Sequence, residues 1–379
     1  TTPPPWLHAT KLTPREKLEL VLGGRSPVIS GEDSDSHFVQ GSVDLTALRQ
    51  ILLHEGVPSE TPEEAAALGA GICTLRGRIW KLLLGVGRVD AEEYLALVRR
   101  GPSCQHDIIK RDVPRTLKGD DLLAKRATPQ RLTRVLTAFV WHLGGTPLPG
   151  ASEHAASGAG TRGEGAAGEE VKCDGASAPV GSDGSGETFS YVQGINVLAA
   201  PLLFCMPEVD AFYALCELLR RGIPRYVNPR LAGVHVSCQL VDRVLQQLDP
   251  VLSQHLAAKQ TTPTIFAFAP SLTLGASWTP LSQVLRLWDV YLSYGLHWHA
   301  LVIAARVLLL REPLLEHESP LKLIGPQAWP ALDADAALAK AREIATKLPP
   351  ALLDELRVHM IASDVPKASS ALAHLRRSP

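Results

Sequence analysis

Hydrophobic side chains recur with the period of an α-helix along most of this chain. One clear case begins at Thr128-Pro129, where a hydroxyl cap precedes a proline that suits the first helical turn. Apolar residues then follow on one helical face, at positions 132, 135, 136, 139 and 140. Similar stripes occupy positions 209–219 and 240–248. The other predicted helices cover 14–22, 43–55, 62–70, 91–100, 280–293, 297–310, 334–347 and 350–361.

Strand-like alternation is scarce. The segment 262–269 is the only candidate strand, and it sits between two predicted helices. No unit of about 20–50 residues repeats along the chain, which argues against a solenoid. The pattern therefore predicts an all-α protein.

Residues 144–187 interrupt the helical pattern. Twelve of the 30 glycines of the chain fall here, and large apolar residues are almost absent. We expect a disordered insertion, because such a segment cannot bury enough surface to offset its ordering entropy. The G-x-G-x-x-G match at 158–163 has no strand before it and no helix after it, so it does not indicate a dinucleotide site. We expect an N-terminal helical extension at 1–70, a main domain at 71–330 containing this insertion, and C-terminal helices with a tail at 331–379.

Composition and charge exclude several classes of function. Lys+Arg 38 nearly equals Asp+Glu 39, so a broad nucleic-acid footprint is not expected. The apolar runs at 195–206 and 301–310 are too short to span a bilayer, and the first residues lack a signal-peptide pattern. We therefore expect a cytoplasmic protein without a membrane span.

The cysteines and histidines indicate no redox or metal chemistry. None of the six cysteines forms a C-x-x-C pair, and four sit in apolar runs, so free thiols in a reducing compartment are expected. The thirteen histidines form no metal-ligand spacing. A P-loop, a G-x-S-x-G element and a Cys/His nucleophile signature are also absent from the sequence, which predicts no nucleotide or hydrolase site of its own.

Two short motifs carry the candidate chemistry. One runs from Ile109 to Arg115 and contains Asp112, and the other begins at Tyr191 and contains Gln193. Together they offer an arginine and a glutamine in a protein that has no nucleotide site. GTP hydrolysis uses such a pair, because an arginine neutralises charge on the transferring phosphoryl group and a glutamine orients the attacking water.

The order of four motifs resembles the TBC domain, the Rab GTPase-activating fold, from about residue 75 to residue 310. The motifs are R-G-R-I-W-K-L-L-L-G at 76–85, I-x-x-D-x-x-R at 109–115, Y-x-Q at 191–193 and R-L-W-D at 286–289. The segments 222–249 and 266–280 resemble the fungal mitotic-exit activators of the spindle-position checkpoint most closely. The resemblance implies an all-helical, V-shaped domain with two catalytic fingers on neighbouring loops.

The resemblance assigns roles to individual residues. It implies that Arg115 is an arginine finger and Gln193 a glutamine finger, both supplied in trans to a partner GTPase. Asp112 is implied to hold the finger loops, with a solvated carboxylate or helix cap as the alternative. We expect Tyr191 to support Gln193 by packing. Asn196 is expected to bond loop backbone near the site.

Other residues of these motifs have structural and functional alternatives. Lys110 and Arg111 could contact an acidic GTPase surface or form a solvated face. Trp80 and Trp288 are expected in the core. Arg286 and Asp289 are expected to form a structural ion pair or caps, with a contact to the GTPase as the alternative, because the resemblance places this helix near the substrate face.

The predicted function is therefore activation of GTP hydrolysis by a Rab-like small GTPase in its GTP form, in mitotic exit or septation control. The alternative is a non-catalytic adaptor of the same fold that binds a GTPase or a scaffold protein. The protein is expected to need no cofactor, since GTP and Mg²⁺ are bound by the partner. A scaffold subunit of a two-component activator and recruitment to the cytoskeleton or spindle pole body are further expectations from the resemblance.

Overall fold

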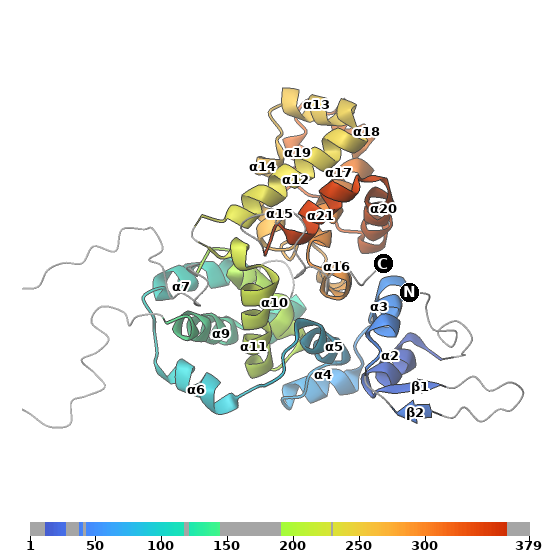
Figure 1. The fold of residues 1–379 in the computed structure, drawn as a ribbon. Helices are drawn as coiled ribbons and strands as arrows, with labels where there is room; N and C mark the ends of the chain where they lie inside the picture. Colours follow the sequence, from blue (N-terminus) through green and yellow to red (C-terminus); the bar gives the residue numbers. More distant parts are fainter. Residues whose placement is uncertain are drawn as a thin grey trace, which may run out of the picture.

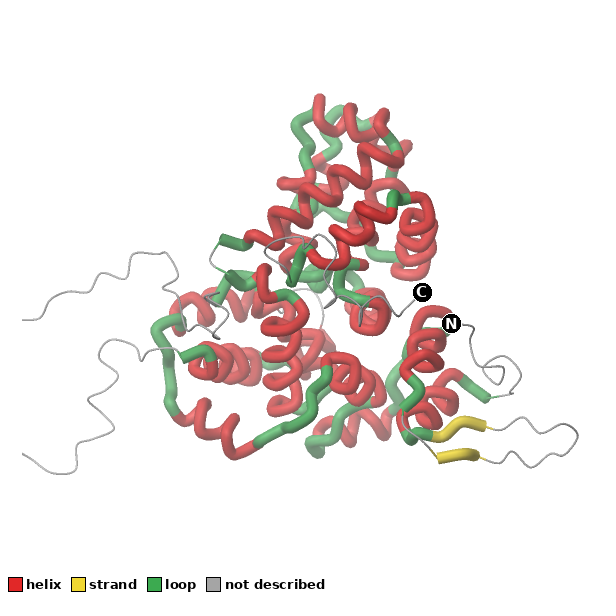
Figure 2. The backbone as a smooth tube through the Cα atoms, viewed as in Figure 1, coloured by secondary structure: helices red, strands yellow, loops and turns green. Residues whose placement is uncertain are grey.

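The computed structural model describes residues 12–27, 38–40, 43–116, 121–144, 191–228 and 230–361. Figure 1 shows two helical groups that meet near α16. Figure 2 shows that helices make up nearly all of the regular structure. The predicted all-α class is confirmed. The predicted insertion at 144–187 lies, apart from its first residue, outside the described residues.

The lower group in Figure 1 holds the N-terminal half of the described chain. Two three-residue strands, β1 (Arg25–Pro27) and β2 (Phe38–Gln40), pair antiparallel beside it and were not predicted. The helices are α2 (Pro14–Leu22), α3 (Leu45–His54), α4 (Pro62–Gly69), α5 (Leu75–Leu84), α6 (Ala91–Arg99), α7 (His106–Thr116), α8 (Asp121–Arg126), α9 (Pro129–His142), α10 (Ile195–Cys205) and α11 (Glu208–Glu217).

The chain then enters the upper group through a π-helical turn (Leu218–Gly222) and a 3-10 turn (Pro224–Tyr226). The helix α16 lies at the junction of the two groups (Figure 1). The helices from here on are α12 (Ala232–Leu248), α13 (Pro250–Ala258), α14 (Pro263–Phe266), α15 (Phe268–Leu272), α16 (Leu281–Tyr294), α17 (Trp298–Leu309), α18 (Arg311–Glu316), α19 (Leu321–Ile324), α20 (Ala334–Lys347) and α21 (Pro350–Val358).

Local caps explain why several helix starts were predicted to the residue. Thr13 accepts from the Glu16 amide, and the Glu16 carboxylate accepts from the Thr13 amide, which closes a capping box before α2. Thr128 likewise accepts from the Arg131 amide at the start of α9. By contrast, the candidate strand 262–269 is wrong. It forms α14 and α15, because Pro263 after Thr262 starts a helical turn.

The segments outside the expected main domain pack directly on it. The helix α3 lies against α16, and α20 lies against α17 and α16. One hydrophobic core extends from Leu18 to Met360 without a break at either expected boundary. The domain limits at residues 70 and 330 stay a prediction.

A buried carboxylate joins two of the four sequence motifs. Asp289 of α16 is fully buried and accepts from Arg76 Nε at 3.1 Å and from Trp80 Nε1 at 2.9 Å. The Val57 amide donates to its other oxygen at 3.4 Å. The Trp80 ring lies 5.5 Å from that of Trp288, and both are buried, as predicted. The motifs at 76–85 and 286–289 therefore fasten α5 to α16.

Arg286 and Asp289 do not pair with each other; of the two expected roles, ion pair or cap, Arg286 has that of a helix cap. Arg286 instead donates to the Leu52 and Leu53 carbonyls at 2.6 and 2.7 Å, and it pairs with Asp335 at 3.1 Å. Arg286 thus donates hydrogen bonds to carbonyls in the last turn of α3. These carbonyls carry partial negative charge because they lie at the C-terminus of a helix. Both residues are structural, but each with a different partner.

Two buried histidines fasten α21 to the upper group. The Nε2 atoms of His299 and His359 each lie 2.9 Å from the Tyr226 hydroxyl. Their Nδ1 atoms face the carbonyls of Leu296 and Leu356, which can only accept, so both rings carry their proton on Nδ1. Burial lowers the pKa of His299 to about 3 and that of His359 to about 4.

These histidines should make the fold sensitive to mild acid. Histidine in the unfolded chain has a pKa of about 6.5. Between that pH and the lower pKa values of the folded state, the unfolded chain binds protons that the folded chain does not bind. We expect the free energy of unfolding to be highest above about pH 6.5 and to fall by up to ~1.4 kcal/mol per pH unit for each histidine. Urea titrations between pH 7 and 5 measure this slope. His299→Gln should reduce the slope and exposed His235→Gln should not; equal slopes in all three proteins would contradict the assignment.

Candidate functional site

The helix α7 presents Arg115 to solvent. Ile109 and Val113 are buried on its inner face, against α9 and α10. Arg111 and Arg115 stand four residues apart, so they share the outer face, and both are exposed. Pro114 lacks an amide proton, and the helix ends two residues after it. Arg115 therefore projects from the last turn of a well-packed helix.

Gln193 lies in the turn directly before α10 and is also exposed. The following residue, Gly194, has φ of +116°, a conformation that favours glycine. A Cβ at this position would lie 3.0 Å from the Leu272 side chain of α15. The turn that carries Gln193 is thus pressed against the upper helical group, and only glycine fits there.

Asn196 joins the two elements that carry Arg115 and Gln193. Its Oδ1 accepts from the Gly194 amide at 2.9 Å, which fixes the turn after Gln193. Its Nδ2 donates to Thr116 Oγ1 at 2.7 Å and to the Asp112 carbonyl at 3.4 Å. Since Asn196 is buried, these bonds are shielded from water. The end of α7 and the start of α10 are therefore held as one unit.

Asp112 and Tyr191 form a second connection between the same elements. The Tyr191 hydroxyl donates to Asp112 Oδ2 at 3.2 Å, and both residues are buried. Burial raises the pKa of the Asp112 carboxyl, while the Tyr191 hydrogen bond and the charges of Arg115 and Arg111 oppose that rise. Burial also raises the pKa of the Tyr191 phenol, which keeps the hydroxyl protonated as a donor.

The structure thus brings together most of the predicted site residues. Arg115, Asp112, Tyr191, Gln193 and Asn196 lie on α7 and at the start of α10, which pack against each other. Arg111 is exposed, and its Nε donates to the Asp107 carbonyl of its own helix at 3.2 Å. Lys110 is exposed but, five positions from Arg115, faces another side of α7. The roles proposed for these residues stay predictions.

Sequence reasoning missed Thr116 and Gly194. Thr116 donates to the Asp112 carbonyl at 3.1 Å and accepts from Asn196, so it is central to the connection. Its position directly after Arg115 is the only signal in the sequence. Gly194 follows Gln193, and a glycine after a motif residue could have indicated a turn with positive φ.

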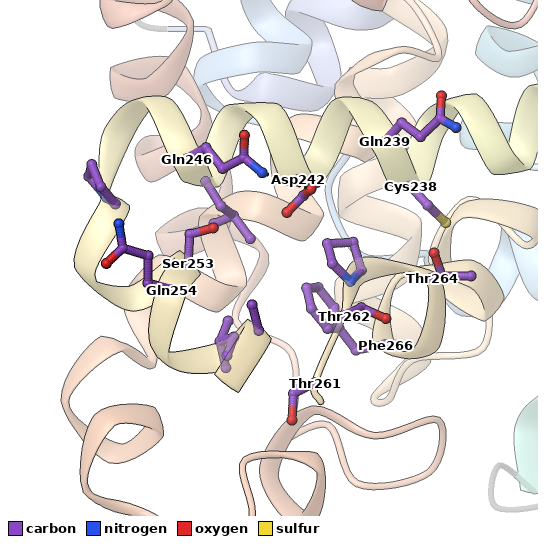
Figure 3. A pocket seen from close by; sticks show the side chains of 15 residues that line it. Cys238, Gln239, Asp242, Gln246, Ser253, Gln254, Thr261, Thr262, Thr264 and Phe266 are labelled. Atoms are coloured by element: carbon purple, nitrogen blue, oxygen red, sulfur yellow. Dashed lines mark hydrogen bonds between the residues drawn. The ribbon is translucent and has the colours of Figure 1, made fainter. Parts of the chain in front are cut away.

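A cavity of about 660 Å³ lies apart from these residues, in the upper group. Figure 3 shows it between α12, α13 and the start of α14, with Asp242, Ser253 and Thr262 among its lining side chains. Gln246 donates to Asp242 at 2.9 Å across one turn of α12. Arg115 and Gln193 do not line this cavity and are exposed at the surface.

Comparison with known proteins identifies the family. The family model for the Rab-GTPase-TBC domain matches residues 186–315. Cell division control protein 16 of Schizosaccharomyces pombe is 32% identical over 83% of this chain and 88% of its own length. The chain belongs to the Rab-GTPase-TBC family.

Other relatives of this TBC chain agree with that assignment. Mitotic check point protein BUB2 of Saccharomyces cerevisiae is 28% identical over 85% of this chain and 93% of its own length. The crystal structure of the Ypt/Rab-GAP domain of Gyp1p is similar in fold, with a TM-score of 0.55 at 18% identity over 80% of this chain and 93% of that one. The predicted TBC fold is therefore confirmed.

The described helices include none that is both long and apolar enough to cross a bilayer. Five of the six cysteines are described, and all five are free thiols. Cys173 lies outside the described residues.

The Asn196 connection can be tested by removing it. Asn196→Ala leaves the Gly194 amide without its acceptor and Thr116 without its donor, which should cost about 1–3 kcal/mol of stability. Because Arg115 and Gln193 would then be held less rigidly, we expect the stimulated rate of GTP hydrolysis to fall by up to ~10²-fold if these two side chains take part in it. Thermal unfolding and single-turnover hydrolysis measure the two effects. Thr116→Val removes two hydrogen bonds where Asn196→Ala removes three, and it leaves the bond to the Gly194 amide in place, so it should give a smaller loss of both. Wild-type rates in both variants would contradict the connection.

Proposed function

We propose that this chain accelerates GTP hydrolysis by a Rab-like small GTPase, to which it supplies Arg115 and Gln193. One observation carries the proposal: the two side chains are exposed on adjoining elements that buried bonds through Asn196 and Asp112 hold together. A planar guanidinium suits phosphate oxygens because it offers forked donors and stays charged. A carboxamide can both donate to and accept from an attacking water.

The surroundings of the two side chains support this role over a structural one. Asp112, the nearest carboxylate on α7, accepts from Tyr191, and none of the ion pairs found in the described ranges involves Arg115. The guanidinium thus remains available for a partner's phosphates. Nucleotide and Mg²⁺ are held by the GTPase in this mechanism, and the chain contributes only protein groups.

The relatives support a role in the cell cycle. Two of them are named as a mitotic check point protein and a cell division control protein. We place this chain in mitotic exit or septation control, with a cytoplasmic location and recruitment to the spindle pole body. A scaffold subunit that completes a two-component activator is part of the same proposal.

Single-turnover GTP hydrolysis tests the activity directly. A panel of GTP-loaded Rab-like GTPases is mixed with increasing amounts of the full chain, and phosphate release is followed. Acceleration that saturates for at least one GTPase supports the proposal. Binding without acceleration would instead identify a non-catalytic adaptor for a GTPase, and no binding across the panel would contradict both of these roles.

Gln193 can be tested in the same assay. Gln193→Ala removes the amide that positions water, and we expect the stimulated rate at saturating chain to fall by about 10²–10³-fold, by analogy with other preorganised catalytic donors. Gln193→Glu keeps the shape but replaces the amide donor by a carboxylate, so it should not restore the rate. Since Gln193 is exposed, the melting temperature should stay near that of the wild type. A fully active Gln193→Ala would exclude this role for the side chain.

A further inference from the structure

A guanidinium is buried in the upper helical group without a carboxylate. Arg306 of α17 is 5% exposed, and it appears in no ion pair within the described ranges. Burial lowers the pKa of Arg306 to about 10, so it stays charged at neutral pH. A buried charge is normally paired, since its removal from water is costly. Arg306 therefore needs a counter-charge that its described neighbours do not supply.

Two tryptophans enclose this guanidinium. Its central carbon lies 4.3 Å from the ring centroid of Trp278 and 4.8 Å from that of Trp329. The two indole centroids are 5.8 Å apart. Cation–π contacts of this kind stabilise the charge, as does the C-terminal end of α17, where Arg306 lies in the last turn. Neither the two indole rings nor the end of α17 accepts a hydrogen bond from the guanidinium nitrogens in the described structure.

Several buried polar groups around Arg306 that can donate have no hydrogen-bond partner in the described structure. Arg306 Nη2 donates to the Pro330 carbonyl at 2.6 Å, but Nη1 has no acceptor among the described residues. The same holds for Trp278 Nε1, Trp329 Nε1 and the Tyr291 hydroxyl, all of them buried atoms. Tyr291 belongs to α16, which packs against the helix α17 that carries Arg306. Native proteins rarely leave several buried donors unpaired in one place.

We propose that this cluster, the Arg306 cage, binds a small monovalent inorganic anion of the halide class. An anion supplies the negative charge that Arg306 lacks and accepts hydrogen bonds from several donors at once. Because Arg306, Trp278 and Tyr291 are buried, they offer almost no surface to a peptide segment, which favours a single ion as the ligand. Trp329 is only partly buried, so the cage lies at the edge of the core, where an ion can exchange with solvent.

This site goes beyond the proposed function and is independent of it. The cage is built from α16, α17 and the segments before α16 and α20, whereas Arg115 and Gln193 belong to α7 and α10. Binding there would stabilise the folded state, because a ligand that binds only the native protein raises its stability by mass action. Anion binding at the Arg306 cage is therefore measured by thermal stability rather than by GTP hydrolysis.

Anion exchange at constant ionic strength tests the cage. Replacing sodium gluconate by sodium chloride, from about 5 to about 150 mM, should raise the melting temperature of the full chain by roughly 2–4 °C. Arg306→Met removes the charge and keeps an apolar side chain of similar length, so its melting temperature should not respond to chloride. Exposed Arg243→Met is the matched control and should respond as the wild type does.

Two further measurements keep the test decisive if Arg306→Met folds poorly. Trp329→Phe keeps an aromatic ring but removes one donor, and it should show a weaker chloride response. Crystals grown in bromide should show an anomalous peak within hydrogen-bond distance of Arg306 Nη1. Any one of three results would overturn the proposal. The melting temperature of the wild type could be the same in chloride and gluconate, Arg306→Met could respond to chloride as the wild type does, or bromide crystals could lack this peak.

Discussion

Replacing Arg115 by alanine is expected to lower the stimulated rate of GTP hydrolysis by about 10³–10⁵-fold, the range known for arginine fingers in other GTPase activators. That loss corresponds to about 4–7 kcal/mol of transition-state stabilisation. The physical reason is that charge on the transferring phosphoryl group would lose its neutralising guanidinium. Single-turnover hydrolysis at saturating chain measures the effect without interference from GTPase turnover.

A matched variant separates charge from geometry at this position. Arg115→Lys keeps the positive charge but loses the forked donors, so its rate should lie between those of the wild type and Arg115→Ala. Both variants should unfold at the wild-type temperature, because Arg115 is exposed. If Arg115→Ala keeps full activity while binding the GTPase normally, the arginine-finger mechanism does not apply to this protein.

The largest expected effect on stability comes from Asp289. Asp289→Ala removes the acceptor of Arg76 and Trp80 and leaves the largely buried guanidinium of Arg76 without its partner. Breaking a buried ion pair from one side typically costs about 3–5 kcal/mol. Denaturant unfolding of the full chain measures the loss. The stimulated rate of any protein that remains folded should change little, since the hydrogen bonds to the Asp289 carboxylate come from Val57, Arg76 and Trp80 and not from α7 or the turn that carries Gln193.

Asp289→Asn is the control for this prediction. The amide keeps the shape and can still accept from Trp80 Nε1, but it carries no charge for Arg76. We expect its stability to lie between those of the wild type and Asp289→Ala. If all three proteins unfold at the same denaturant concentration, the bonds around Asp289 contribute little to stability.

The helices could be predicted from the sequence where their ends are set locally. Pro14–Leu22 and Ala334–Lys347 were predicted to the residue, since Thr13 and Asp333 cap them and the apolar spacing is regular. The segment 262–269 could not, because a short apolar run fits a strand and a helical turn equally well. The strands β1 and β2 have only three residues each, too few for a periodic signal.

The candidate site was predictable in its residue types but not in its bonds. Arg115 and Gln193 followed from two motifs in a known order. The bond between Asn196 and Thr116 spans 80 residues, and no local pattern specifies such a contact. For the same reason the sequence could not decide between the two expected roles of Arg286 and Asp289, an ion pair or helix caps. Their spacing of three positions favours a local pair, but Asp289 meets Arg76, which is 213 residues away.

The contacts of Asp289 bear on where this protein can be divided. The family model covers residues 186–315, yet three of the groups that donate to Asp289 belong to Val57, Arg76 and Trp80. A recombinant fragment limited to the matched span would expose an unpaired carboxylate in the middle of α16. The shortest autonomous unit must therefore begin at or before Val57, well upstream of the stretch by which the family is recognised.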